Sequence, residues 1–173
     1  MKIGIDFDDT IVETKEKVQE FLNKYNLKQF NSFEEKEEFY KKHIDNMTPT
    51  LTLKQNVKEI LNKLSNNELY IITARNNYYS NNNQNLVLKY MKDNELPIKE
   101  VCFDCYKEGK AIKCKELGID LFIDDFIDNC LEVEKLGIKS LLFQNEFDGL
   151  TTVNSWNDIL EYVEEGYGRK DNN

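Results

Sequence analysis

The sequence predicts an α/β protein with a three-layer, Rossmann-like, doubly wound parallel sheet and a small helical cap inserted after the first strand. Short apolar runs alternate along the chain with segments of helical periodicity, which is typical of α/β folds. The apolar runs are nearly continuous, as expected of parallel strands that helices cover on both faces. The chain between the first two runs is longer than a single crossover helix requires, which indicates an insertion.

Each expected strand is a brief run rich in Ile, Leu, Val, Phe or Tyr. Runs of this kind, bounded by polar segments, are typical of strands buried in a parallel sheet. The connections between them are expected to be right-handed crossovers. The predicted strands are Lys2–Phe7, Leu69–Thr73, Glu100–Asp104, Leu121–Asp124 and Lys139–Phe143.

Apolar residues recur at helical spacing in the segments between the strands. Two of these helices are expected to end on a glycine, Gly118 and Gly137, because glycine readily adopts the left-handed conformation of a helix C-terminus. The polar stretch Asn76–Asn85 is expected to be a loop. The predicted helices are Val18–Tyr25, Phe33–Ile44, Thr52–Leu64, Leu86–Met91, Ile112–Leu117 and Cys130–Leu136.

The first crossover contains the insertion. The gap from Glu13 to Glu68 holds three helical patterns, although a single helix is enough to connect two parallel strands. The extra material, Thr14–Thr50, is interpreted as a small helical cap, and Pro49 marks its exit. The expected division is a Rossmann-like core of residues 1–13 and 51–165, a cap of residues 14–50 and a frayed tail of residues 166–173.

Composition limits the class of protein and its partners. The 173 residues are 40% hydrophobic, which suits one globular domain with a small insertion. The net charge of −9 disfavours a nucleic-acid partner, because such proteins need a basic surface. No apolar run approaches the roughly 20 residues of a membrane span, and the first residues do not resemble a signal peptide. We expect a cytoplasmic protein without a membrane partner, and the sequence leaves its oligomeric state open.

Cysteine and histidine chemistry is disfavoured. Cys102 and Cys105 form a single C-x-x-C pattern, and no second pair or histidine cluster completes a zinc site. Because Cys102 lies in an apolar run, a buried structural thiol is favoured over a metal or redox role for the pair. His43 is the only histidine, and its charged helical surroundings predict a surface position. A Ser-His-Asp or Cys-His mechanism would depend on that one residue.

Acidic and hydroxyl side chains follow three of the predicted strands. Ligands of open α/β sheets bind beyond the carboxyl ends of the strands, so these side chains are expected to meet at one edge. Crowded carboxylates repel one another unless a cation is bound, and hard oxygen ligands suit Mg²⁺. The sequence therefore predicts a magnesium site at this edge. The segments are Asp6-Phe7-Asp8-Asp9-Thr10, Thr73-Ala74-Arg75 and Asp124-Asp125.

These segments resemble the motifs of the haloacid dehalogenase (HAD) superfamily. The stretch IGIDFDDTIV, Ile3–Val12, matches the first motif of hydrophobic residues followed by D-x-D-x-[TV]. Thr73 in IITAR matches the Ser or Thr that closes the second strand. Asp124 and Asp125 in LFIDD match the acidic pair after the fourth strand. Each motif alone is weak, but their order along the chain makes the resemblance specific.

The third motif of the family is a lysine before the fourth strand. Lys110 is the best match, and Lys107 is the alternative. In chain order the motifs extend from Met1 to about Phe143, which covers the whole predicted core. Asp128 is a further acid near the fourth motif, and a solvent-facing position on a helix is favoured for it over a place among the metal ligands.

The resemblance implies a phosphoryl-transfer site that uses Mg²⁺. Asp6 would attack phosphorus and form an aspartyl-phosphate. Asp8 would protonate the leaving oxygen and then activate water, and its backbone carbonyl would bind the metal. Lys110 would neutralise negative charge on the nucleophile and on the transferring group. The implied metal ligands are Asp6, Asp8, Asp124 and Asp125.

The resemblance also implies contacts with the substrate. Thr73 and nearby backbone N–H groups would hold phosphoryl oxygens, and Thr10, Ala74 and Arg75 are expected to contact the substrate. Structural interpretations compete with these roles. In isolation, a helix-capping role is favoured for Thr73, the Asp8–Thr10 segment would serve equally well as a helix cap, and Arg75 would serve equally well as the partner of a surface acid.

Asp8 narrows the predicted reaction to phosphomonoester hydrolysis or a mutase reaction, because the dehalogenases of the superfamily lack an acid at this position. The small cap and the short segment between Arg75 and Lys110 make the chain similar to the cytosolic 5′(3′)-deoxyribonucleotidases and their bacterial relatives. That similarity implies a small phosphorylated metabolite as substrate, such as a nucleoside monophosphate. The alternatives are a sugar-phosphate phosphatase or mutase on the same fold, or a catalytically silent protein that binds a phosphorylated ligand.

Two other functions of α/β proteins are disfavoured. A response-regulator receiver domain carries its acidic pair after the first strand and its phosphoacceptor after the third, whereas here the acidic pair follows the fourth strand. A nucleotide-cofactor enzyme is disfavoured because no G-x-G-x-x-G pattern follows any predicted strand.

Overall fold

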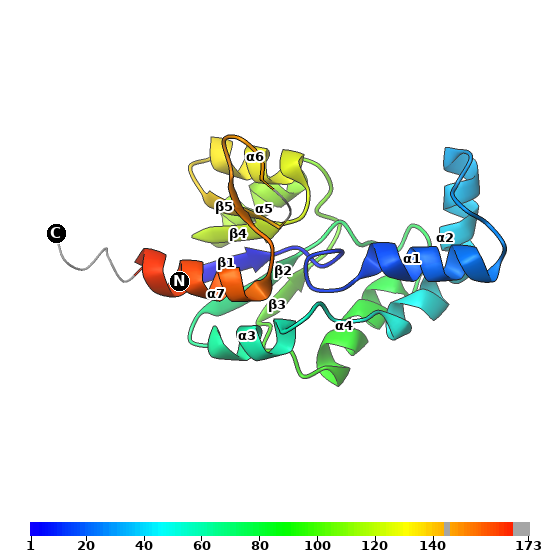
Figure 1. Cartoon of the computed structure of the whole chain (residues 1–173), viewed down its shortest axis with the longest axis horizontal. Coiled ribbons are helices and arrows are strands. Elements are labelled where there is room, and N and C mark those ends of the chain that lie inside the picture. The colour runs from blue at the N-terminus through cyan, green and yellow to red at the C-terminus, as the bar shows by residue number, and fades with distance from the viewer. Residues whose placement is uncertain (144–145, 168–173) are drawn as a thin grey trace.

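A parallel sheet of six strands forms the centre of the molecule (Figure 1). The computed structural model describes residues 1–143 and 146–167. The strand order is β3-β2-β1-β4-β5-β6, and every neighbouring pair is parallel. This order defines a doubly wound, Rossmann-like sheet. The strands are β1 (Lys2–Ile5), β2 (Glu68–Ile72), β3 (Glu100–Cys102), β4 (Leu121–Asp124), β5 (Lys139–Phe143) and β6 (Thr151–Val153).

The predicted fold class and the five predicted strands are confirmed, and β6 was not predicted. Its three residues, Thr-Thr-Val, contain no apolar run that would mark a strand. β6 exists because it adds to the edge of β5, with Leu142 opposite Thr152 and Phe143 opposite Val153. Pairing with a strand that is already formed supplies the stability that its own sequence lacks.

Helices occupy the connections between the strands. Gly118 ends α5 at a φ of +66°, and Gly137 follows α6 at a φ of +76°, as the sequence predicts. No helix within residues 1–143 and 146–167 is both long and apolar enough to span a membrane. The helices are α1 (Thr14–Lys24), α2 (Phe33–Met47), the 3₁₀ helix η1 (Thr48–Thr50), α3 (Val57–Lys63), α4 (Asn83–Asp93), α5 (Gly109–Leu117), α6 (Ile127–Lys135) and α7 (Trp156–Tyr167).

Several predicted boundaries differ from the structure, and two of them have a clear physical cause. The helix expected at Thr52–Leu64 begins only at Val57, because the residues before it pair with the strand exit of β1. Glu13 N donates to Thr52 O at 2.9 Å, and Lys54 N donates to Ile11 O at 2.8 Å. The two ends of the insertion are thus hydrogen-bonded to each other.

The second incorrect boundary is the end of the polar loop expected at Asn76–Asn85. α4 already begins at Asn83, inside that loop, because asparagine is tolerated in the first turn of a helix. Asn83 is buried there, and its amide donates to Asn76 O at 2.7 Å.

Helices cover both faces of the sheet, which makes three layers. α5 and α6 lie on one face, and α3 and α7 lie on the other (Figure 1). Alternate residues of β1 face opposite layers, so Ile3 and Ile5 join the cluster that contains residues of α3, α4 and α7. Gly4 faces the other layer, where a Cβ would lie only 2.9 Å from Ile72 Cδ1. Glycine at this position therefore leaves room for the side chains of Ile72 and Phe122 from the neighbouring strands.

The insertion extends away from the sheet as the helices α1 and α2 (Figure 1). These helices pack around a small apolar cluster of their own that includes Leu22, Phe39 and Met47. We refer to residues 14–50 as the cap, and these boundaries stay a prediction. Of the tail expected at residues 166–173, the first two residues form the end of α7, and residues 168–173 lie outside the described part of the chain.

His43 corrects the predicted surface position, because it is buried in the cap with an exposed fraction of 5%. Its ring lies 4.5 Å from the ring of Tyr25 and 4.8 Å from that of Phe39, measured between centroids. The residues Phe39, His43 and Met47 recur every four positions, which places them on one face of α2. The charged neighbours that suggested exposure lie on the other face.

Candidate active site

The site lies at the carboxyl ends of β1 and β4, where the strand order of the sheet reverses. Such switch points form the ligand-binding crevice of doubly wound sheets. Asp6 follows β1 directly, and its backbone N donates to Ile123 O of β4 at 2.8 Å. Asp124 is the last residue of β4, and Thr73 follows β2. The strand ends therefore meet at one edge, as the sequence predicts.

Lys110 joins two of these aspartates. Its Nζ lies 2.6 Å from Asp6 Oδ1 and 2.7 Å from Asp124 Oδ2. The three side chains are at most 6% exposed. Lys107, the alternative from the sequence, is exposed in the turn before α5. The structure therefore brings Lys110, and not Lys107, into contact with the predicted nucleophile.

The ionisation of this cluster is limited by burial. Burial raises the pKa of Asp6 well above its usual value, and it also raises the pKa of Asp124. Burial alone would lower the pKa of Lys110, but the two carboxylates outweigh it and raise that pKa. The single ammonium group of Lys110 is thus the cationic partner of two buried carboxylates. Full ionisation of both requires additional positive charge nearby.

Asp124 is held in place by two further donors. Phe126 N donates to Asp124 Oδ1 at 2.8 Å, and Asn129 Nδ2 donates to Asp124 Oδ2 at 3.0 Å. Sequence reasoning missed Asn129. The available signal was its position in the first turns of the helix that follows the acidic pair, where a side chain points back toward the strand end.

Three carboxylates form a group that fits a metal ion. One oxygen each of Asp6, Asp124 and Asp125 lies within 4.8 Å of the others. The group offers only oxygen donors, which suits a hard cation such as Mg²⁺. Asp128 is exposed on α6 and is not part of this group, as expected. The side chain of Asp8 is not part of it either, because it is directed to Arg75.

The carboxylates around the site outnumber the neighbouring cations by two, and this formal excess equals the charge of one divalent ion. It is an independent reason to expect such an ion, since uncompensated carboxylates repel one another. The carboxylates are Asp6, Asp8, Asp9, Asp124 and Asp125, and the cations paired with them are Lys15, Arg75 and Lys110.

Asp8 has different surroundings from Asp6. Arg75 donates to both of its oxygens, from Nε at 2.9 Å and from Nη2 at 2.6 Å. Thr14, the first residue of α1, donates to Oδ1 at 2.6 Å. Burial would raise the pKa of Asp8, but Arg75 and Thr14 outweigh it, so this pKa lies below its usual value. Asp8 is therefore a carboxylate in this arrangement.

Lys15 covers the outer edge of the acidic group. Its Nζ lies 2.8 Å from Asp125 Oδ2 and 3.6 Å from Asp9 Oδ2. The lysine side chain is 74% exposed, so a pair of this kind contributes little to stability. Its contact with Asp125 is easily exchanged for another cation.

The predicted substrate contacts differ in accessibility. Thr73 is buried, and its Oγ1 accepts a hydrogen bond from Arg75 N at 3.1 Å. Ala74 lies on the wall of two of the pockets described below. Thr10 is fully buried, and its Oγ1 has no hydrogen-bond partner among the described residues. The structure therefore does not bring Thr10 to the surface of the site.

Among the described residues, three pockets open around the site. One, of about 310 Å³, is lined by Asp9, Lys15 and Asp125, and Ala74 and Tyr106 line the other two.

The smaller of these two pockets has a volume of about 360 Å³ and lies between the core and α2. We call it the cap pocket. Asp8 and Arg75 form its floor, and four tyrosines and Lys36 line it. The tyrosines are Tyr40, Tyr78, Tyr79 and Tyr106.

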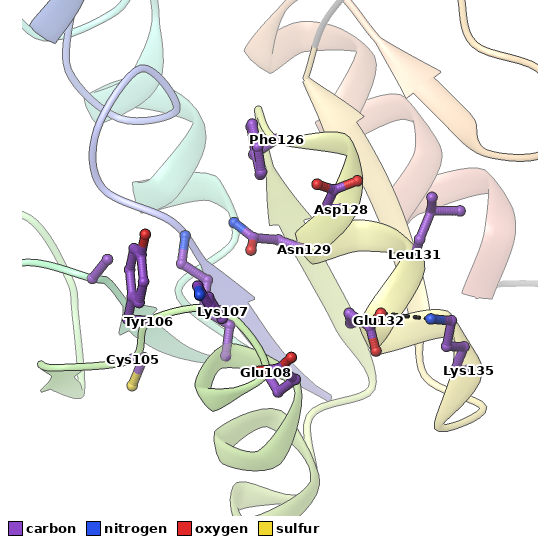
Figure 2. Close-up of a pocket in the computed structure, with 12 residues that line it drawn as sticks. Cys105, Tyr106, Lys107, Glu108, Phe126, Asp128, Asn129, Leu131, Glu132 and Lys135 are labelled. Carbon is purple, nitrogen blue, oxygen red and sulfur yellow. Dashed lines mark hydrogen bonds and ion pairs between the residues drawn. The ribbon is translucent and has the colours of Figure 1, made fainter. Parts of the chain in front are cut away.

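The larger of the two pockets, of about 640 Å³, lies on the other side of Tyr106 (Figure 2). Lys107 and Glu108 from the turn before α5 face Asp128 and Glu132 of α6 across it. Lys110 lines this pocket, whereas Asp8 lines the cap pocket. Asp6 itself lines neither of these two pockets.

The cysteines are buried thiols. All four are free, and the metal-ligand group found among the described residues contains none of them. Burial raises the pKa of Cys102 to about 11, so this thiol is not a thiolate near neutral pH. These features fit a structural role for Cys102 and Cys105.

Comparison with known proteins identifies one curated relative and a set of solved structures with a similar fold. No family model matches the chain. A curated protein from Clostridium acetobutylicum, named as a nucleotidase, is 33% identical over 116 residues. That match covers 66% of this chain and 58% of the relative, so the chain aligns with little more than half of the relative's length.

Solved structures resemble the chain over nearly its whole length. A haloacid dehalogenase-like hydrolase from Streptococcus pneumoniae has a TM-score of 0.70 at 12% identity, covering 94% of this chain and 97% of that chain. A HAD family hydrolase from Deinococcus radiodurans with bound phosphate and sodium has a TM-score of 0.65 at 13% identity, with coverages of 95% and 96%. The HAD hydrolase YfnB from Bacillus subtilis, bound to magnesium, has a TM-score of 0.62 at 10% identity, with coverages of 94% and 97%.

The fold is that of the HAD-superfamily hydrolases, which confirms the resemblance predicted from the motifs. Identities of 10% to 13% establish the fold and leave the substrate undefined.

Proposed function

We propose that this protein is a Mg²⁺-dependent phosphomonoester hydrolase that forms an aspartyl-phosphate on Asp6. The observation that carries the proposal is the contact of Lys110 Nζ with both Asp6 Oδ1 and Asp124 Oδ2, at 2.6 and 2.7 Å, beyond the strand ends of a HAD hydrolase fold. A lysine buried between two carboxylates is costly to maintain for stability alone. Its position suits the neutralisation of charge during phosphoryl transfer.

The residues of the chain divide the reaction between them. Asp6 Oδ attacks phosphorus while the bond between phosphorus and the ester oxygen breaks, and Lys110 offsets the negative charge on both partners. The departing alkoxide takes up a proton from Asp8, which must first be protonated; the negative charge of a phosphate ester bound beside it would favour that form, against the effect of Arg75 and Thr14. In the second half-reaction, the Asp8 carboxylate removes a proton from the water that attacks the phosphorus and releases Asp6. Thr73, whose Oγ1 accepts from Arg75 N at 3.1 Å, is proposed to hold a phosphoryl oxygen together with nearby backbone N–H groups.

Asp6, Asp124 and Asp125 would hold the magnesium ion, because their oxygens converge and their charge exceeds that of nearby cations. When bound, the ion would offset the charge of the carboxylates and of the transferring phosphoryl group. The backbone carbonyl of Asp8 is proposed as a further ligand, on the basis of the family resemblance alone.

The proposed substrate is a nucleoside monophosphate. Tyr40 and Tyr79 in the cap pocket have ring centroids 5.2 Å apart at an angle of 26°, which leaves an aromatic wall near the floor formed by Asp8. Stacking of a nucleobase on an aromatic side chain contributes roughly 1–3 kcal/mol. The relative named as a nucleotidase supports the same substrate class. Of the ligand contacts expected from the sequence, Ala74 stays a proposed contact because it lines the cap pocket, whereas Thr10 is fully buried and Arg75 is directed to Asp8.

The test is phosphate release from a panel of nucleoside monophosphates and sugar phosphates, with Mg²⁺ and after chelation. We expect nucleoside monophosphates to have the highest kcat/KM and activity to require the metal. Faster turnover of sugar phosphates would contradict the nucleoside monophosphate as substrate, but it would remain consistent with an aspartyl-phosphate on Asp6. Absence of turnover for every ester would contradict the hydrolase proposal and favour a protein that binds a phosphorylated ligand.

A further inference from the structure

We infer that Arg75 is a positioning residue for Asp8, tied to the exit of the cap, and is not a ligand of the substrate phosphate. This inference rests on the proposed hydrolase function and changes the role expected for Arg75 from the sequence. It concerns the side of the site that faces the cap pocket.

The hydrogen bonds of Arg75 carry the inference. A guanidinium has five N–H donors in a fixed planar arrangement. Two donate to the Asp8 carboxylate, and Nη1 donates to Thr48 Oγ1 at 3.1 Å and to Asn83 Oδ1 at 3.2 Å. Four of the five donors are therefore committed, and a phosphate that took more than one donor would have to break an existing bond.

Burial fixes these contacts in place. The Arg75 side chain is 8% exposed, Thr48 is fully buried and Asn83 is 1% exposed. The guanidinium also lies over the ring of Phe7, 5.5 Å from its centroid. Breaking such contacts would leave buried polar groups without partners, at a cost of roughly 1–3 kcal/mol for each group. The arginine is thus built into the structure around Asp8.

The backbone of Arg75 is fixed as well. Its N donates to Thr73 Oγ1 at 3.1 Å, and its O accepts from Asp104 N at 3.0 Å. The side chain therefore starts from a rigid point between β2 and β3. Because the Arg75 backbone and side chain are both fixed, the guanidinium determines the orientation of the Asp8 carboxylate.

Thr48 connects this arrangement to the cap. It is the first residue of η1, directly after the last residue of α2, where the chain returns from the cap to the core. A shift of that segment changes the position of an oxygen that Arg75 Nη1 contacts, and Arg75 transmits the shift to Asp8. Proton transfer by Asp8 is in this way made sensitive to the position of the cap.

The first experiment compares two phosphomonoesters in the full chain with Mg²⁺. p-Nitrophenyl phosphate has a good leaving group that needs little protonation, whereas a nucleoside 5′-phosphate has a poor alkoxide leaving group. A general acid contributes roughly 10²–10⁴-fold to such reactions. For Arg75→Lys, which keeps the charge and removes the planar guanidinium, we expect kcat/KM to fall roughly 10–100-fold for the nucleotide and less than about fivefold for the aryl ester.

A double-mutant cycle tests whether Arg75 acts through Asp8. Asp8→Asn should show the same dependence on the leaving group, and the double variant should be no worse than Asp8→Asn alone. Thr48→Val leaves Arg75 and Asp8 intact and removes one contact with the cap exit. We expect it to lower kcat/KM for the nucleotide by roughly two- to fivefold and to spare the aryl ester. It also serves as the test if Arg75→Lys fails to fold, as judged by circular dichroism.

Calorimetric titration with inorganic phosphate separates this inference from the hydrolase proposal, because it requires no turnover. We expect Arg75→Lys to bind phosphate within about threefold of the wild-type affinity, since Arg75 is not expected to donate to it. A loss of tenfold or more, or equal losses of kcat/KM for both esters, would identify Arg75 as a phosphate ligand and overturn the inference. Absence of turnover in the wild type would reject the hydrolase proposal, while the titration would still decide the role of Arg75.

Discussion

The two halves of the site pair a carboxylate with a cation in different ways. On the core side, Asp6 and Asp124 come from the ends of β1 and β4 and Lys110 comes from α5, and all three are almost fully buried. On the cap side, the carboxylate of Asp8 is 31% exposed, and Arg75 links it to Thr48 at the exit of the cap. The pKa of Asp6 is raised mainly by burial, whereas that of Asp8 is lowered by its partners against the effect of burial.

This contrast separates two requirements of the proposed reaction. The opposite pKa shifts describe the two surroundings without a metal ion, and a cation held by Asp6, Asp124 and Asp125 would favour the ionised Asp6 that attacks phosphorus. The core side depends only on the sheet and its helices, so it provides the chemistry that a change of cap would preserve. The cap side includes residues on both sides of the connection, so its geometry responds to whatever the cap binds.

Asp6→Asn is expected to have the largest effect. An amide oxygen is a poor nucleophile, so phosphate release should fall by roughly 10³-fold or more. The shape of the side chain is kept, and the fold should be intact by circular dichroism. Mass spectrometry of acid-quenched wild-type enzyme should detect the aspartyl-phosphate adduct, which the variant lacks. Full Mg²⁺-dependent activity in this variant would contradict the assignment of Asp6 as nucleophile.

Replacement of the two cations by methionine compares the stability of the two sides. Lys110→Met leaves two buried carboxylates without their partner, which should lower the free energy of unfolding by about 3–5 kcal/mol. Arg75→Met should cost less, about 1–3 kcal/mol, because water can solvate the partly exposed Asp8. Urea denaturation measures both values. A larger loss for Arg75→Met would reverse the comparison.

Magnesium should stabilise the core side specifically. Binding to the folded chain at several times the dissociation constant contributes about 1 kcal/mol, which raises Tm by roughly 2–4 °C in a domain of this size. Asp124→Asn removes one of the three grouped carboxylates and should abolish the rise. Asp8→Asn serves as the control, because the Asp8 side chain lies outside the group. A rise that survives in Asp124→Asn would place the ion elsewhere.

The smallest expected effect is a pH dependence of stability from the cap. Burial lowers the pKa of His43 from the ordinary value of 6.5, and the nearby charges of Lys42 and Lys24 act in the same direction. As the pH falls below about 6.5, the unfolded chain takes up a proton that the folded chain does not, so stability falls. His43→Phe should lose less Tm than the wild type between pH 7.5 and 5.5. An equal loss in both proteins would show that His43 is not the group responsible.

The sequence was sufficient for features that depend on local pattern. Strands such as Leu121–Asp124 are apolar runs, and the aspartates at their ends are visible as motifs. The switch between β1 and β4 follows from the order of strands and helices. The sequence did not reveal β6, because its Thr-Thr-Val segment becomes a strand only through its neighbour.

The contacts of the cap side were also beyond sequence reasoning. Arg75 is 67 residues from Asp8 and 27 residues from Thr48, and only the folded chain shows that one guanidinium reaches both. The burial of His43 was missed for a related reason, since its charged neighbours in sequence are not its neighbours in space. Asn129 was missed because its contact with Asp124 depends on where α6 begins.

The hydrogen bond between Glu13 N and Thr52 O, at 2.9 Å, has a consequence for how this protein can change. The two ends of residues 14–51 meet at a narrow neck, so the whole segment can be exchanged for another of different length without altering the path of the core. The exceptions are Thr14 and Thr48, which contact Asp8 and Arg75, so a replacement segment must supply equivalent hydroxyl groups. A chimaera that carries a foreign segment between Glu13 and Thr52 is a direct route to new substrate specificity on the same core.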